Sequence, residues 1–271
     1  MMHTKEEKMA AFGRLLDILD ILRVECPWDK KQTNESLRPN TIEETYELCD
    51  ALIKQDDKNI CKELGDVLLH ICFYAKIASE KGVFDMSDVC NQLCDKLVFR
   101  HPHVFHKQST DSEFVVKTEQ DVSEQWERIK QTEKDGNRSV LSGVPDSLPS
   151  IIKAYRIQEK AHNVGFDWND ESHLQVWEKV KEEISEFEEE VHSSDKNRAR
   201  ISGEFGDLLF SLINVARHLG INPDNALELT NQKFIKRFNY IEGQSLERGK
   251  HISDLSLDEM NSFWEQAKQL P

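Results

Sequence analysis

EEISEFEEEVHSSDKNRARISGEFGD, residues 182–207, is the stretch that decides the fold of this chain. Apolar residues recur at helical spacing around both of its acidic groups, which predicts helices over residues 176–191 and 205–219. Side chains three or four positions apart share one face of a helix. If the two helices pack antiparallel, four carboxylates meet at their seam, with Glu182 at its edge: those of Glu183, Glu186, Glu204 and Asp207.

A meeting of four carboxylates is unfavourable unless a cation joins them. Two like charges ~5 Å apart repel by ~3 kcal/mol at an effective dielectric constant of ~20. A divalent ion reverses the sign of that interaction, and hard oxygen ligands suit Mg²⁺, or Mn²⁺ in its place, better than zinc or copper. The pattern therefore predicts a magnesium site between two helices.

The same two-part pattern occurs earlier in the chain. Residues 63–69, ELGDVLL, match residues 204–210, EFGDLLF, and the acids that precede them match as well. The first copy contains Glu43, Glu44, Glu47, Glu63 and Asp66. An internal repeat of this kind indicates a duplicated domain. We predict an all-α chain of two tandem helical bundles, at residues 1–133 and 150–271, joined by a linker at 134–149 that contains Gly and Pro.

Further helices are expected at residues 10–24, 61–79, 85–99, 122–133, 148–161, 223–241 and 257–270, and no run is typical of a β-strand. Loops are expected at 54–59, 106–121, 163–168 and 243–256. Thr41, with Glu44 three residues on, is the predicted N-cap of the helix that carries the first acids. Gly65 and Gly206 lie inside helices, where each costs ~1 kcal/mol relative to Ala. We take them to indicate close approach by a neighbouring helix.

Three alternatives compete with a catalytic metal site at these acids. The chain holds 50 acidic residues among 271, so one Glu-rich helix face would ordinarily be solvated surface. Two copies of a two-part pattern are much harder to explain in that way. A di-iron oxidase would need His three residues after Glu63 and Glu204, where this chain has Asp. A non-catalytic helical module with a structural metal stays open.

Composition narrows the range of partners and locations. A net charge of −15 argues against a nucleic-acid partner, because duplex binding rests on Lys and Arg neutralising phosphates. The charged N-terminus has no secretory signal core, and the best apolar run, residues 67–75, is too short to cross a membrane. The six cysteines, none in Cys-x-x-Cys spacing, favour reduced thiols in a cytoplasmic protein.

At these acids the chain resembles the MazG-type nucleoside triphosphate pyrophosphohydrolases. The shared signature is Glu-Glu-x-x-Glu followed by Glu-x-x-Asp, and three more segments are similar to the tandem form of that family: CPWD (26–29), RHPHVF (100–105) and NVGFDW (163–168). The resemblance covers nearly the whole chain. It implies an all-α fold, Mg²⁺ dependence, homodimers, and hydrolysis of a nucleoside triphosphate to the monophosphate and diphosphate.

The resemblance also implies roles for individual residues. The magnesium ligands would be Glu183, Glu186, Glu204 and Asp207. Glu182 would either orient the attacking water or make an outer contact at the metal. The triphosphate would meet Lys233, Lys236 and Arg237, for which a solvated basic patch is the alternative. Lys179, one turn before Glu183, is a further candidate by its position. Trp264 would lie near the nucleotide, with a place in the hydrophobic core as the alternative. Phe166 and Trp168 are candidates for stacking on the base.

The two copies differ in one phosphate-binding cation. Phe99 stands where the second copy has Lys236, although Lys96 and Arg100 remain. We therefore expect the C-terminal copy to be catalytic, with a second metal site at the N-terminal acids Glu44, Glu47, Glu63 and Asp66. The expected role is clearance of unwanted nucleotides. A pyrophosphohydrolase restricted to one substrate, such as dUTP or phosphoribosyl-ATP, stays an alternative.

Overall fold

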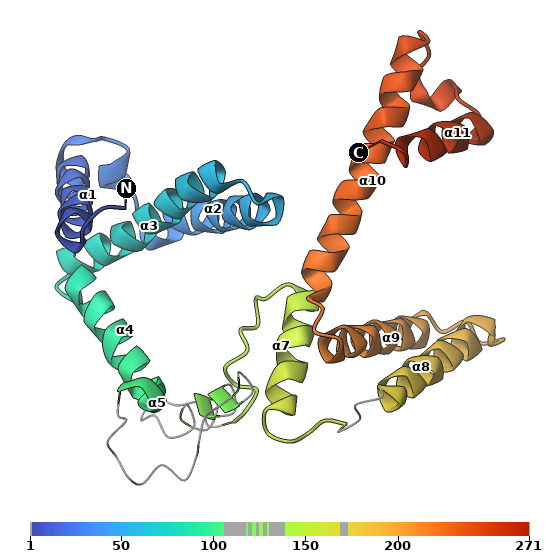
Figure 1. Cartoon of the computed structure of the whole chain (residues 1–271), viewed down its shortest axis with the longest axis horizontal. Coiled ribbons are helices and arrows are strands. Elements are labelled where there is room, and N and C mark those ends of the chain that lie inside the picture. Colours follow the sequence, from blue (N-terminus) through green and yellow to red (C-terminus); the bar gives the residue numbers. More distant parts are fainter. Residues whose placement is uncertain are drawn as a thin grey trace. The chain divides into compact units, whose positions relative to one another are not determined.

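The computed structural model describes residues 2–105, 139–168 and 173–270, together with isolated positions between 118 and 129. These residues form helices and turns, and they contain no β-strand (Figure 1). The all-α prediction is thereby confirmed. The chain divides into two compact units, Met1–Glu113 and Phe114–Pro271. The expected helix at 122–133 and loop at 106–121 lie mostly outside the described residues.

The first unit is organised around a helical hairpin. Its elements are α1 (Lys5–Glu25), η1 (Asp29–Lys31), α2 (Asn34–Lys54), α3 (Asp57–Glu80), α4 (Met86–Arg100) and α5 (Pro102–Phe105). Helices α2 and α3 pack along each other, and α1 packs on α3 (Figure 1). The buried core of this unit consists of Leu19, Leu37, Cys72, Phe73 and Ile77. The loop expected at 54–59 is much shorter, because α3 already begins at Asp57.

The N-cap prediction at Thr41 is wrong. Helix α2 begins at Asn34, and its cap is Thr33, whose side chain accepts a hydrogen bond from the backbone N–H of Ser36. Thr41 lies inside the helix, where its hydroxyl is 3.0 Å from the carbonyl oxygen of Leu37 and 2.6 Å from the hydroxyl of Tyr74 on α3. Its polar group therefore joins two helices instead of starting one.

The second unit repeats the hairpin and adds a further helix pair. Its elements are α7 (Ser150–His162), α8 (Leu174–His192), α9 (Arg198–His218), α10 (Pro223–Glu247), η2 (Ile252–Asp254) and α11 (Leu257–Ala267). Helices α8 and α9 pack together around Val176, Val180 and Val215. A separate cluster of Ile241, Leu255 and Phe263 joins α10, η2 and α11. The loop expected from residue 243 is wrong in its first part, since α10 continues to Glu247.

Neither helical glycine marks a close contact within the described residues. A Cβ atom added at Gly65 or at Gly206 would meet no atom within 4 Å, so our interpretation of these glycines is wrong. The surface of α9 next to Gly206 is instead open, with Phe205, Leu209 and Leu212 exposed at 48, 46 and 42%. Among the described helices, none combines the length and apolar character that crossing a bilayer requires.

The predicted linker at 134–149 lies inside the second unit and is described from residue 139 onward. Its described part forms turns that lead into α7. The domain bounds at 1–133 and 150–271 stay a prediction.

Candidate functional site

The two acidic helices of the second unit place carboxylates on their buried stripes. On α8, Val176, Val180 and Glu183 follow one another at helical spacing and are 1, 3 and 5% exposed. A carboxylate in such a position costs free energy unless it is paired or bound to a cation. The short turn at 193–197 brings α9 back along α8, which places Glu204 opposite this stripe.

The seam between α8 and α9 brings three of the four expected acids together. Single carboxylate oxygens of Glu183, Glu186 and Glu204 all lie within 4.8 Å of one another; we call this group the C-terminal acid cluster. Asp207 lies outside this group, one turn further along α9. Glu182 is exposed at the edge of the seam, as its sequence position suggested. The donors are carboxylate oxygens alone, which fits Mg²⁺ or Mn²⁺.

Negative charge on the C-terminal acid cluster is energetically unfavourable. Burial, together with the charges of Glu186, Asp207 and Glu183, raises the pKa of the Glu204 carboxyl. A raised carboxyl pKa means that the fold disfavours the ionised form at this position. A divalent cation among these oxygens would remove that penalty, because each repulsion would be replaced by an attraction to the ion.

Lys179 supplies one positive charge at the cluster. Its Nζ atom lies 2.7 Å from a carboxylate oxygen of Glu182 and 2.7 Å from one of Glu183. The hydrogen bonds to these two carboxylates raise the pKa of the Lys179 ammonium group, so it stays charged at neutral pH. Lys179 therefore compensates the carboxylate of Glu183, whose side chain is only 7% exposed.

The first unit contains a similar N-terminal acid cluster between α2 and α3. Single carboxylate oxygens of Glu44, Glu47 and Glu63 lie within 4.8 Å of one another. Burial and the charges of Asp66, Glu47 and Glu63 raise the pKa of Glu44. Lys62 neutralises part of this charge, with its Nζ 2.9 Å from Glu63 and 3.8 Å from Asp66. In this unit the compensating lysine, Lys62, lies on α3, the second helix of the hairpin. In the second unit it is Lys179 on α8, the first helix of the hairpin.

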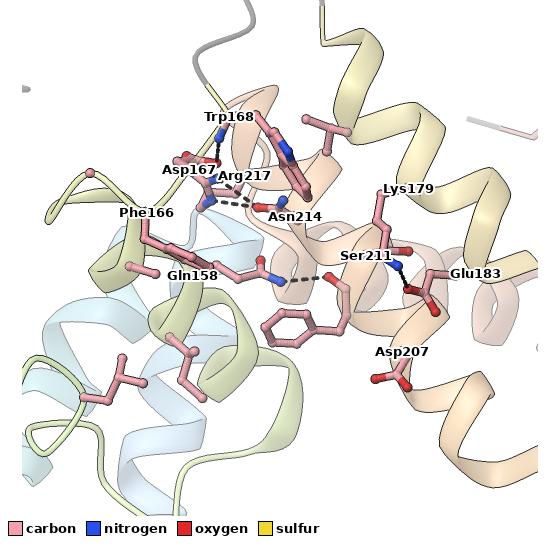
Figure 2. Close-up of a pocket in the computed structure, with 16 residues that line it drawn as sticks. Gln158, Phe166, Asp167, Trp168, Lys179, Glu183, Asp207, Ser211, Asn214 and Arg217 are labelled. Carbon is pink, nitrogen blue, oxygen red and sulfur yellow. Dashed lines mark hydrogen bonds and ion pairs between the residues drawn. The ribbon is translucent and has the colours of Figure 1, made fainter. Parts of the chain in front are cut away.

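A cavity of about 690 Å³ lies beside the C-terminal acid cluster (Figure 2). Its walls come from α7, the loop after α7, α8 and α9. Lys179, Glu183 and Asp207 lie at one end, and Phe166 and Trp168 lie at the other (Figure 2). The volume falls within the range of ~300–1,000 Å³ that is usual for small-molecule sites. Glu183 belongs both to the acid cluster and to the cavity wall.

A buried ionic network stands next to this cavity. The side chain of Asp167, 7% exposed, accepts a hydrogen bond from Nη2 of Arg217 at 2.6 Å. Its oxygens also lie 2.7 Å from Nδ1 of His162 and 3.0 Å from Nε2 of His218. Burial alone would raise the pKa of Asp167, but the hydrogen bonds and charge of Arg217 bring it below its ordinary value. Asp167 is therefore an ionised anchor.

This network holds the loop that carries the two aromatic residues of the cavity. Asp167 stands between Phe166 and Trp168, so its bonds to α7 and α9 position both neighbours (Figure 2). Sequence reasoning missed this role. Ala216-Arg217 aligns with Ala75-Lys76 of the first copy, and this match was the available signal at Arg217. The partner of Arg217 lies 50 residues away along the chain, and no local pattern points to it.

The expected phosphate-binding cations of α10 lie apart from the cavity. Lys233 and Lys236 are exposed, and the guanidinium carbon of Arg237 lies 5.5 Å from the ring centroid of Trp264 on α11. None of these four residues lines the cavity. Within the part of the chain that the structure describes, the cations in the cavity wall are Lys179 and Arg217.

Two helical hairpins that each gather carboxylates at their seam, with a ligand-sized cavity beside one of them, define a class of protein: a duplicated all-α protein with two candidate metal sites. The MazG nucleotide pyrophosphohydrolase domain matches residues 32–105 and 171–241 of this chain. The two matched segments contain the two acid clusters. The chain belongs to the MazG family.

Three relatives that are at least 40% identical support this membership. The chain is 40% identical over 266 residues to the nucleoside triphosphate pyrophosphohydrolase of Escherichia coli K12, covering 96% of this chain and 98% of that protein. It is 40% identical over 260 residues to the nucleoside triphosphate pyrophosphohydrolase/pyrophosphatase MazG of Thermotoga maritima, with 95% of each chain covered. It is also 44% identical over 270 residues to YabN of Bacillus subtilis, of which it covers 53%.

Proposed function

We propose that this protein is a Mg²⁺-dependent nucleoside triphosphate pyrophosphohydrolase. It would convert NTP or dNTP and water to the nucleoside monophosphate and diphosphate, and so remove unwanted nucleotides from the cellular pool. The observation that carries this proposal is the C-terminal acid cluster, which shares Glu183 with a cavity of ligand size. The family and the names of its full-length relatives support the reaction class.

The acidic end of the cavity would receive the triphosphate. Glu183, Glu186, Glu204 and Asp207 would hold the metal, which when bound neutralises charge on the phosphate oxygens. Lys179 adds a positive charge at the same end and donates hydrogen bonds to Glu182 and Glu183. Glu182, exposed at the edge of the seam, is available as an acceptor that orients the attacking water or a ligand water of the metal.

The aromatic end of the cavity would receive the base. Phe166 is 82% exposed and Trp168 is 41% exposed, although both line the cavity. Exposed aromatic rings at a cavity mouth offer stacking surfaces worth ~1–3 kcal/mol per base. The Asp167 network would keep these rings in place before the nucleotide enters.

We also propose a homodimer. The exposed apolar side chains of Phe205, Leu209 and Leu212 on α9 offer a face that a second copy can cover. Helical hairpins commonly complete a four-helix core in this way. The α10 cations Lys233, Lys236 and Arg237, with Trp264, keep their proposed role at the nucleotide. Because they do not line the cavity of one chain, this role requires assembly or movement of α10.

The C-terminal copy is our proposed catalytic copy, and the N-terminal acid cluster would have a weaker or regulatory role. Phe99 in place of Lys236 deprives the N-terminal copy of a phosphate cation. A cytoplasmic location agrees with the six cysteines, all of which are free.

One substitution on each hairpin tests the proposal. Glu183→Gln keeps the side-chain shape but removes a metal ligand, so diphosphate release with Mg²⁺ should fall at least ~100-fold, since even outer contacts of metals are worth 10–100-fold. Glu47→Gln should change the rate by less than ~10-fold on the same scale. Glu189→Gln, an exposed residue of α8 outside the cluster, is the matched control.

Three other results would each lead to a different conclusion about the function. Activity that survives Glu183→Gln but is lost in Glu47→Gln would reverse the assignment of the two copies. If the wild-type protein with Mg²⁺ hydrolyses no nucleotide in a panel of NTPs, dNTPs, dUTP and phosphoribosyl-ATP, the protein is a non-catalytic module. Hydrolysis of one panel member alone would identify a restricted-substrate enzyme.

A further inference from the structure

A buried amide stands in the wall of the cavity without a complete set of hydrogen bonds. Gln158 on α7 is 6% exposed and lines the cavity between its acidic and aromatic ends (Figure 2). Its Oε1 atom is buried and has no hydrogen-bond partner among the described residues. Buried polar atoms in native proteins are nearly always paired. An unpaired acceptor in a cavity wall therefore points to a partner that enters the cavity.

The amide nitrogen of Gln158 fixes the orientation of the side-chain amide. Nε2 of Gln158 donates a hydrogen bond of 2.8 Å to the backbone carbonyl oxygen of Phe210 on α9. A carbonyl oxygen only accepts hydrogen bonds, so an exchange of the amide nitrogen and oxygen would place two acceptors against each other. The Gln158 oxygen consequently stays an acceptor. In Figure 2 it is turned toward the side of the cavity where Asn214 and Trp168 lie.

We propose that Oε1 of Gln158 reads the nucleobase by accepting a hydrogen bond from one of its N–H groups. The inference rests on the proposed nucleotide hydrolysis and adds a specificity-determining residue to it. In the proposed complex the phosphates occupy the acidic end of the cavity. The part of the ligand that lies beside Gln158, between the phosphates and the rings of Phe166 and Trp168, is therefore the nucleoside. Stacking on those rings would hold the base, and Gln158 would select bases that present a donor there.

The test compares nucleotides that differ at one hydrogen-bond donor site of the base: the exocyclic amino group in the first two pairs, and the N3–H group in the third. ATP is paired with purine riboside triphosphate, CTP with zebularine triphosphate, and UTP with 3-methyl-UTP. A base without the donor leaves Oε1 unpaired in the complex, so the wild-type protein should lose about 10- to 100-fold in kcat/KM within at least one pair. In Gln158→Leu, which keeps side-chain bulk but removes the acceptor, the members of that pair should be hydrolysed at equal kcat/KM.

A matched substitution and the wild-type comparison keep the test decisive. Gln92→Leu makes the same chemical change on an exposed face of α4 and should preserve the wild-type ratios. If Gln158→Leu does not fold, the wild-type ratios alone decide. Equal kcat/KM within all three pairs, or an unchanged ratio in a folded Gln158→Leu protein, overturns the inference. A wild-type protein that hydrolyses none of these six nucleotides, and no NTP, dNTP, dUTP or phosphoribosyl-ATP of the panel above, refutes the proposed function instead.

Discussion

Replacing Asp167 by Asn tests whether the ionic network beside the cavity supports the fold of the second unit. The substitution keeps the shape of the side chain but removes the charge that faces His162, Arg217 and His218. Arg217, whose side chain is only 10% exposed, would lose its counter-charge. Leaving one member of a buried ion pair uncompensated costs about 3–5 kcal/mol. For a unit of this size, such a loss lowers the melting temperature by about 10 °C.

The pH dependence follows from the pKa of Asp167. Although burial opposes it, Arg217 and His218 hold this pKa below its ordinary value. The stabilisation is therefore complete above the unfolded-state pKa of about 3.9 and is lost as the pH falls through the lower folded-state pKa. The difference in melting temperature between wild type and Asp167→Asn should shrink below about pH 4.

Differential scanning calorimetry from pH 3 to 7 measures both effects. Asp195→Asn is the control, because Asp195 is 77% exposed and lies 4.0 Å from Arg200, an exposed pair worth at most about 1 kcal/mol. A melting temperature for Asp167→Asn equal to that of the control, or a difference that grows below pH 4, would refute the assigned role of Asp167.

Two further predictions concern the acidic hairpin of the second unit. In the dissociated single chain, Gly206→Ala should stabilise the fold by ~1 kcal/mol in urea unfolding, because its Cβ would enter open space inside a helix; destabilisation would show that a second copy or another surface covers this position. Lys179→Met should destabilise the protein by about 1–3 kcal/mol without metal, since it leaves buried Glu183 unpaired. Added MgCl₂ should raise the melting temperature of Lys179→Met more than that of wild type, and an equal rise would contradict the role of Lys179 as the compensating charge.

The sequence predicted those features of the site that depend on local spacing. Glu183 and Glu186 share a helix face because they are three residues apart, and any helix over this segment brings them together. The duplication placed Glu44 and Glu47 in the same relation without knowledge of the fold. Helix ends were predicted less well, because several residues near one terminus can cap a helix. Thr33 is the cap of α2, whereas the expected cap Thr41 bonds to Tyr74 across the hairpin.

The sequence by itself thus determined an all-α, duplicated chain with two acid clusters of magnesium-type ligands, because helical periodicity is a property of neighbouring residues. Only the tertiary structure decided which distant groups meet. The pairing of Asp167 with Arg217, the lone acceptor of Gln158 and the distance of Lys233 from the cavity depend on how each helix is rotated and docked. Those variables are set by the packing of whole faces, which no short stretch of sequence encodes.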